Sequence, residues 1–222
     1  MIDSIQTFGD SFLYGSELSD CKDFEFGVGY SQLTWPALAA KKLKLDYNCW
    51  AEGGSGNQSI AFKVFRYARP GALNIINWSW IDRFDHNFTR VGWPKTIRPD
   101  NSELATFYYK NIHSEYDDKV RNLTIAYSVL SYLKNNNMPF IMTYMDHLMV
   151  DDASSISHIR DEIVDNLQTF PNNQTFLEWS RANGYPESGN WHPLEEAHEK
   201  AAEYWLPIYQ QAINTHTATT KD

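Results

Sequence analysis

The stretch that decides the fold lies near the N-terminus and reads Ile5-Gln6-Thr7-Phe8-Gly9-Asp10-Ser11. A short, largely apolar segment runs into Gly-Asp-Ser, three residue types that favour turns. This pattern is typical of a first β-strand that ends in a turn. In α/β proteins, ligands bind outside the carboxyl ends of the strands. We therefore regard Ser11 as a candidate nucleophile, with an ordinary Gly-Asp-Ser turn as the alternative.

Along the rest of the chain, apolar runs of strand length alternate with longer segments of helical periodicity. This alternation indicates a parallel sheet covered by helices. The predicted strands cover residues 2–8, 45–50, 72–78 and 138–144, and the predicted helices cover about 32–44, 58–68, 102–135, 157–167, 175–183 and 193–213. No linker or repeat divides the 222 residues, a length that suits one substantial core, so we expect a single domain over residues 1–222.

The charge and the apolar content exclude several classes of partner. The net charge of −9 argues against non-specific binding to nucleic acid and to anionic membranes, because both depend on Lys and Arg. No apolar run is long enough to span a membrane, and the N-terminus lacks the pattern of a secretory signal. We expect a protein that is cytoplasmic as synthesised, although a component of a virus particle would look the same. The oligomeric state and the pairing of Cys21 with Cys49 stay open.

Aromatic residues gather in and just before a long predicted loop at about residues 79–101. Loops of this length in compact domains tend to be functional. We expect a structured aromatic lid, and the candidate substrate-binding residues are Trp78, Trp80, Phe84 and Trp93.

His192 is the candidate base for Ser11. It precedes Pro193 and an acidic, helix-favouring run, so it is expected at or beside a helix N-terminus. The helix dipole there disfavours imidazolium, which helps the ring to accept a proton. His198 lies inside the same predicted helix, and we interpret it as structural. The sequence contains no convincing metal-ligand spacing and no nucleotide-binding glycine motif, so neither a metal nor a cofactor is expected.

Taken together, these segments resemble the SGNH, or GDSL-like, hydrolase superfamily. Phe8-Gly9-Asp10-Ser11 looks like the first block of that family, which contains the nucleophilic serine. The stretch Ala51-Glu52-Gly53-Gly54-Ser55-Gly56-Asn57 resembles the second block, and Trp191-His192-Pro193 resembles the last. The resemblance implies a flavodoxin-like α/β/α fold with a central parallel sheet. It also implies an oxyanion hole that includes the backbone N–H groups of Ser11 and Gly54.

Two departures from the family pattern affect the expected site. The third block usually supplies an Asn to the oxyanion, whereas here the third strand runs into Asn77-Trp78-Ser79, so Asn77 and Ser79 are the candidate donors. The family also commonly places an Asp three residues before the histidine, where this chain has Gly189. Asn190, a backbone carbonyl or an acid from elsewhere, such as Asp146, is then the candidate to orient His192. A Ser-His dyad is the alternative.

The leading hypothesis is a serine esterase or carbohydrate O-deacylase that acts through an acyl-enzyme intermediate, with Ser11 as nucleophile and His192 as base. Its substrate would be a small-molecule or carbohydrate ester. One alternative is a catalytically lapsed member of the same fold that works as a carbohydrate-binding or virion assembly module. Another is an O-acyltransferase, which would use the same serine and base.

Overall fold

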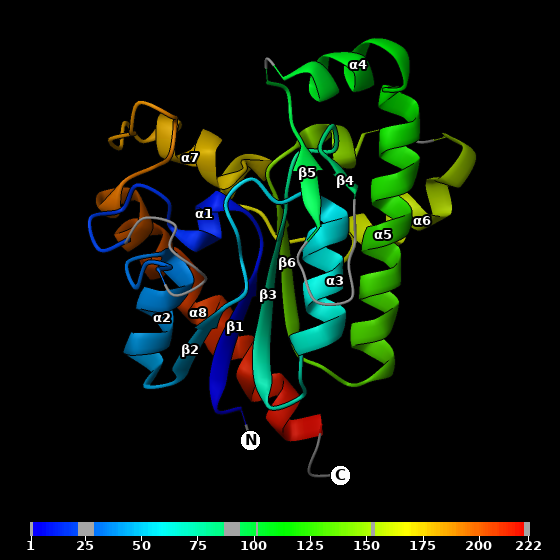
Figure 1. Ribbon diagram of the computed structural model, residues 1–222. Coiled ribbons are helices and arrows are strands. Elements are labelled where there is room, and N and C mark those ends of the chain that lie inside the picture. Colours follow the sequence, from blue (N-terminus) through cyan, green and yellow to red (C-terminus); the bar gives the residue numbers. More distant parts are fainter. Residues whose placement is uncertain (1, 22–28, 87–93, 101, 152–153, 220–222) are drawn as a thin grey trace.

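The computed structural model describes residues 2–21, 29–86, 94–100, 102–151 and 154–219. Its centre is a parallel sheet in the order β2-β1-β3-β6, with β1 at Ser4–Phe8, β2 at Asp46–Cys49, β3 at Ala72–Trp78 and β6 at Phe140–Tyr144 (Figure 1). The four predicted strands are therefore confirmed. Beyond β6, Leu167 adds only an isolated parallel bridge to Met142.

Helices cover both faces of this sheet, so the three-layer arrangement that the resemblance implies is confirmed (Figure 1). Side chains alternate between the faces along each strand because the strand period is two. Ile75 of β3 packs in one core cluster, whereas Ile76 and Trp78 pack in the other. The first face carries α1 (Ser11–Tyr14), α2 (Trp35–Leu43), α7 (Phe176–Ala182) and α8 (Glu195–Thr219), and the second carries α3 (Asn57–Tyr67), α5 (Glu115–Asn135) and α6 (Ser157–Val164).

One long predicted helix is in fact two. The segment predicted at 102–135 divides into α4 (Glu103–Asn111) and α5, and the chain turns at Ile112–Ser114. Ser114 begins α5 as an N-cap, since its hydroxyl accepts a hydrogen bond from the N–H of Asp117. The helical spacing of apolar residues continues across residues 112–114, so the sequence pattern predicted one helix without a turn.

The predicted long loop contains regular structure that the sequence did not indicate. It contains an antiparallel hairpin of β4 (Phe84–His86) and β5 (Lys95–Ile97), whose connection lies outside the described residues. Asp85 fixes the hairpin to the start of α3, because its carboxylate accepts hydrogen bonds from the N–H groups of Gly56 (3.2 Å) and Ser59 (2.7 Å). A Cβ on Gly56 would lie 2.7 Å from the Asp85 oxygens, so only glycine allows this approach. Burial raises the pKa of the Asp85 carboxyl.

Short 3-10 turns complete the connections, at η1 (His147–Met149), η2 (Ser154–Ile156) and η3 (Pro171–Asn173). Across the described ranges, no helix is both long and apolar enough to cross a membrane. Cys21 and Cys49 are not joined by a disulfide.

His198 of α8 lies in the core against α2, where its Nδ1 accepts a hydrogen bond from the N–H of Trp35 at 3.2 Å. Burial lowers the pKa of His198 to about 3.

Candidate active site

Ser11 and His192 are in contact, as the sequence predicts. Ser11 follows β1 closely and opens the short helix α1, whose N-cap is Asp10. The Asp10 carboxylate accepts a hydrogen bond from the N–H of Phe12, and this bond fixes the Gly-Asp-Ser turn. His192 lies in the segment between α7 and α8, and its Nε2 is 2.9 Å from Ser11 Oγ. Helix α8 begins at Glu195 and not at Pro193 as expected, so His192 precedes the helix and is not its N-cap.

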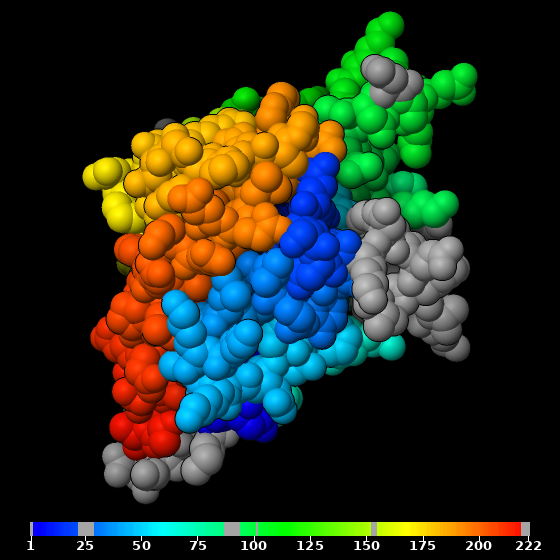
Figure 2. Space-filling model, turned by 90° about the vertical axis from the view of Figure 1, so that its left-hand side faces the viewer, coloured from blue at the N-terminus to red at the C-terminus, as the bar shows by residue number. Residues whose placement is uncertain are grey.

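The residue that contacts the far nitrogen of His192 is Glu17, which the sequence analysis missed. Glu17 Oε2 lies 2.5 Å from His192 Nδ1. The same carboxylate accepts hydrogen bonds from Ser188 Oγ (2.5 Å) and Asn190 Nδ2 (2.6 Å). Hydrogen bonds from Ser188 and His192 lower the pKa of Glu17, so its carboxylate is ionised near neutral pH. In Figure 2 the blue segment that follows Ser11 lies beside the orange segment that precedes α8.

Glu17 therefore occupies the place for which Asn190 and Asp146 were predicted. Asn190 contacts the carboxylate of Glu17 rather than the ring of His192. Asp146 lies at the end of β6, where its two oxygens accept hydrogen bonds from the N–H groups of Ile81 and Leu148. Ser11, His192 and Glu17 bring a hydroxyl, an imidazole and a carboxylate together in the same order as in the catalytic triads of serine hydrolases.

Gly54 lies in the loop that follows β2. Its φ of +79° is a left-handed conformation that favours glycine. The loop is fixed to the serine turn, because the N–H of Glu52 donates to the carbonyl of Gly9 at 3.1 Å. Within the described part of the chain, the N–H groups of Ser11 and Gly54 donate no hydrogen bond. Both residues line one cleft.

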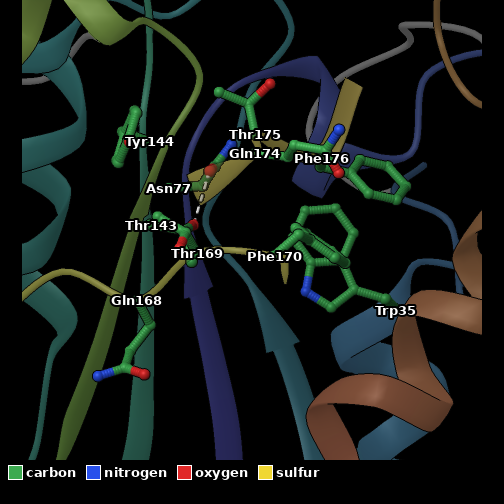
Figure 3. Close-up of a pocket in the computed structure, with 10 residues that line it drawn as sticks. All are labelled: Trp35, Asn77, Thr143, Tyr144, Gln168, Thr169, Phe170, Gln174, Thr175 and Phe176. Carbon is green, nitrogen blue, oxygen red and sulfur yellow. Dashed lines mark hydrogen bonds between the residues drawn. The ribbon is translucent and has the colours of Figure 1, made fainter. Parts of the chain in front are cut away.

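Asn77 and Ser79 do not fit the predicted role of third oxyanion donor. Asn77 lines a separate small cavity of about 10 Å³ with Trp35 and Phe170, and its Oδ1 accepts a hydrogen bond from Thr143 (Figure 3). Its Nδ2 is buried and does not reach the cleft that Ser11 lines. Ser79 donates its hydroxyl hydrogen to Asp10 and its backbone N–H to Asn57. Both donors of Ser79 are thus used inside the protein. The expectation fails because the end of β3 directs these polar groups into the core.

The cleft at Ser11 and His192 has a volume of about 870 Å³ and a mixed lining. Trp80 and Trp191 give it two aromatic walls, and Trp191 is 68% exposed. Its charged residues include Asp82, Arg83 and Arg98.

Only one of the four predicted aromatic residues, Trp80, lines this cleft among the residues that the structure describes. Trp78 is fully buried in the core, and Phe84 packs against Tyr108 with ring centroids 4.9 Å apart. Trp93 lies outside the described residues. Trp191 was missed as a wall of the cleft, although its place beside His192 is a usable signal. In the described segments, no group of three or more His, Cys, Asp or Glu residues is placed to hold a metal ion.

The sequence matches no protein-family model and no curated protein, whereas the fold has clear relatives among solved structures. An esterase from Pseudoalteromonas sp. is similar with a TM-score of 0.57 and 10% identity, over 96% of this chain and 99% of that one. A protein assigned to the G-D-S-L family of lipolytic proteins, from Desulfitobacterium hafniense, gives 0.52 and 12%, over 92% and 98%. A family 2 carbohydrate esterase from Corynascus thermopiles (Myceliophthora fergusii) gives 0.53 and 14%, over 96% and 67%. The chain thus has the fold of GDSL-type and carbohydrate esterases.

Proposed function

We propose that the protein is a serine esterase that hydrolyses small or carbohydrate O-acyl esters. The observation that carries this proposal is the unbroken series of contacts from Ser11 through His192 to Glu17. Glu17 accepts the hydrogen on Nδ1, so the lone pair of Nε2 faces Ser11 Oγ and can accept its proton. The fold shared with known esterases supports the same class of reaction.

The reaction proceeds in two halves. Ser11 Oγ attacks the ester carbonyl as His192 Nε2 takes the hydroxyl proton, and the carbonyl oxygen becomes an oxyanion. The free N–H groups of Ser11 and Gly54 stabilise this oxyanion. His192 then protonates the leaving alcohol, and an acyl-Ser11 ester remains. Water, activated by the same ring, releases the acid and restores Ser11. Glu17 stabilises the imidazolium that forms in each half.

The walls of the cleft support the choice of substrate. Trp80 and Trp191 offer flat apolar faces to either an acyl group or a sugar ring, and the opening is wide enough for a ligand of moderate size. A carbohydrate ester is the more specific expectation, because exposed tryptophans beside polar groups suit a sugar ring.

The test is turnover of p-nitrophenyl acetate by the wild type, Ser11→Ala and His192→Ala, together with labelling by a fluorophosphonate. We expect turnover and labelling in the wild type, and neither in Ser11→Ala. Ser19→Ala is the matched control: Ser19 lies on the same segment, outside the cleft, so turnover should stay at the wild-type level. Undiminished turnover in Ser11→Ala would contradict the mechanism.

A lapsed binding module is the second candidate, and the exposed Trp191 at the mouth of the cleft favours it. This alternative expects a wild type that binds sugars without cleaving esters, and binding that survives Ser11→Ala. An O-acyltransferase would transfer the acyl group to an added sugar alcohol, and analysis of the products separates it from a hydrolase.

A further inference from the structure

We infer that Arg83 is the third donor to the oxyanion, in the role for which Asn77 and Ser79 were the sequence candidates. The inference rests on the proposed esterase function and adds a catalytic residue to it. Arg83 follows β3 by a few residues and lines the same cleft as Ser11 and Gly54.

The guanidinium of Arg83 lies between the two loops that supply the backbone donors. Its Nη1 lies 3.1 Å from Asp10 Oδ2 and 2.9 Å from the carbonyl oxygen of Ser55, and it donates to Ser79 Oγ at 2.7 Å. Asp10 immediately precedes Ser11, and Ser55 immediately follows Gly54. The guanidinium of Arg83 therefore contacts the chain neighbours of both proposed backbone donors.

The other nitrogens of Arg83 are available to a ligand. Nε and Nη2 donate no hydrogen bond to any residue in the described ranges, although the side chain is only 13% exposed. Trp80 supports the guanidinium from one face, with Cζ 4.6 Å from the ring centroid. Asp10 balances the positive charge inside the protein. One nitrogen of the group is thus fixed by the protein, while the other two have no partner among the described residues on a side chain that lines the cleft.

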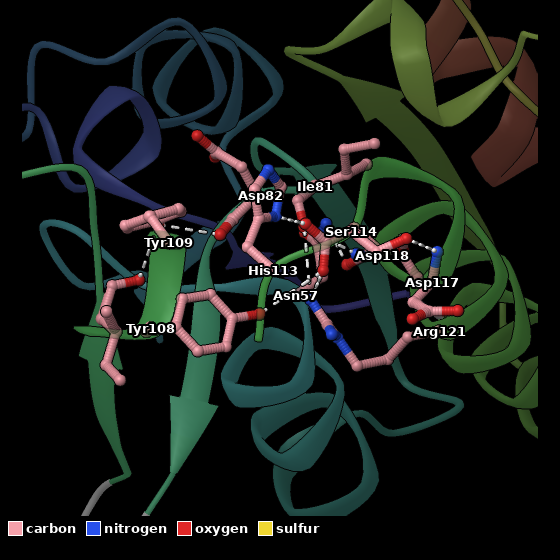
Figure 4. Close-up of polar contacts among 12 residues, drawn as sticks. Asn57, Ile81, Asp82, Tyr108, Tyr109, His113, Ser114, Asp117, Asp118 and Arg121 are labelled. Carbon is pink, nitrogen blue, oxygen red and sulfur yellow. Dashed lines mark hydrogen bonds and ion pairs between the residues drawn. The ribbon is translucent and has the colours of Figure 1, made fainter. Parts of the chain in front are cut away.

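The backbone just before Arg83 is held in place by side chains of α4 and α5. Tyr109 OH donates to the carbonyl of Asp82 at 2.9 Å, and Asn122 Nδ2 donates to the carbonyl of Ile81 at 2.9 Å. Figure 4 shows Tyr109 reaching Asp82 from α4. Rigid support matters because an oxyanion donor is effective only if it needs no rearrangement during the reaction.

Arg98 is the competing cation in the cleft. A Cβ on Gly54 would lie 2.5 Å from Arg98 Nη1, so Arg98 covers the loop of Gly54. Its side chain is exposed and makes no hydrogen bond to a described residue, whereas Arg83 is held by contacts with Asp10, Ser55 and Ser79. Fixed geometry therefore favours Arg83 as the donor.

The test compares Arg83→Lys, Arg83→Gln and Arg98→Gln with the wild type on p-nitrophenyl acetate, with thermal unfolding measured alongside. A lysine keeps the charge beside Asp10 but has no second arm to reach the oxyanion. We expect kcat to fall by about 100-fold or more in both Arg83 variants, as for loss of an oxyanion donor, with KM changed by less than about threefold. Arg83→Lys should keep the melting temperature of the wild type. Arg181→Gln, at a surface ion pair with Glu187, is the matched control.

A second measurement uses a transition-state analogue. Binding of a trifluoromethyl ketone, which forms an oxyanion on Ser11, should shift the side-chain N–H resonance of Arg83 in the wild type, and its affinity should fall in Arg83→Lys in parallel with kcat/KM. Wild-type kcat in Arg83→Lys, or a larger loss in Arg98→Gln than in both Arg83 variants, would overturn the inference and leave the esterase intact. A wild type without turnover or Ser11-dependent labelling would overturn the proposed function, and the inference with it.

Discussion

Replacement of Glu17 by glutamine tests whether this carboxylate stabilises the charged form of His192. The variant keeps the size of the side chain and removes its charge. The charge centres of the imidazolium and the carboxylate would be about 4 Å apart, and at an effective dielectric constant of about 20 such charges attract by about 4 kcal/mol. Solvent screens part of this energy, because the side chains of His192 and Glu17 are 18% and 33% exposed. We therefore expect a loss of about 3 kcal/mol, or roughly 100-fold in kcat.

A second effect acts in the same direction. The amide introduced by Glu17→Gln can donate a hydrogen to Nδ1 of His192, and the ring would then carry its own hydrogen on Nε2, where it cannot accept the proton of Ser11. The assay is the kcat for p-nitrophenyl acetate at neutral pH, together with the rate of fluorophosphonate labelling, since both depend on activation of Ser11. Both rates should fall together.

The matched control for this variant is Glu187→Gln. Glu187 is a carboxylate close to His192 in the sequence, paired with Arg181 at the surface, and it does not line the cleft. Its replacement removes the same charge and should change kcat by less than about twofold, as expected for a surface pair. If Glu17→Gln retained more than about a third of wild-type kcat, the role assigned to Glu17 would be refuted, because the electrostatic loss would then be under about 1 kcal/mol.

Three further predictions concern Gly54, His198 and Asp85. In Gly54→Ala, an alanine held at φ +79° should lower the free energy of unfolding by about 1 kcal/mol. The displaced loop should lower kcat for p-nitrophenyl acetate by more than this small loss of stability explains. The pKa of His198 is about 3 in the folded protein and about 6.5 in the unfolded chain. Between these pH values the unfolded chain binds more protons, so the stability of the fold falls as the pH drops. The free energy of unfolding, measured with urea, should fall by about 1.6 kcal/mol between about pH 6.5 and about pH 5 because of this group, and His198→Gln should flatten that dependence. Asp85→Asn weakens the hydrogen bonds to Gly56 and Ser59, so urea unfolding at neutral pH should show a loss of about 1.5 to 3 kcal/mol, and an unchanged midpoint would contradict the anchoring role.

The sheet and its two helical layers could be predicted because their signal is local. Strands such as Ala72–Trp78 are dense in buried apolar residues, and this density is visible in the sequence itself. The break between α4 and α5 could not be seen, because residues 112–114 interrupt the helix without interrupting its apolar periodicity. The hairpin of β4 and β5 was missed for a related reason, since strands of three residues are too short to show an alternation.

At the site, the residues that could be predicted are those that lie in recognisable local patterns. Ser11 follows a strand and His192 precedes a proline and an acidic helix start, and the structure places the two within hydrogen-bond distance. Glu17 has no such pattern. It is one acidic residue in a polar turn, and only the return of the chain at 188–192 makes it a partner of His192. Asn77 failed for the converse reason, because its position in the sequence suited the role but its side chain points to Thr143.

The position of Glu17 has a consequence for how the site assembles. Ser11 and Glu17, the proposed nucleophile and acid, belong to one short stretch around α1, so a single long-range event, the docking of the segment that carries His192, completes the series of contacts. Where a serine hydrolase has its acid and its histidine on one segment, the two arrive together; here the acid is already beside the nucleophile. The reactivity of Ser11 is therefore a direct measure of that docking. A fluorophosphonate labelling rate, followed during refolding, would time the docking of residues 188–192 onto the segment that carries Ser11 and Glu17.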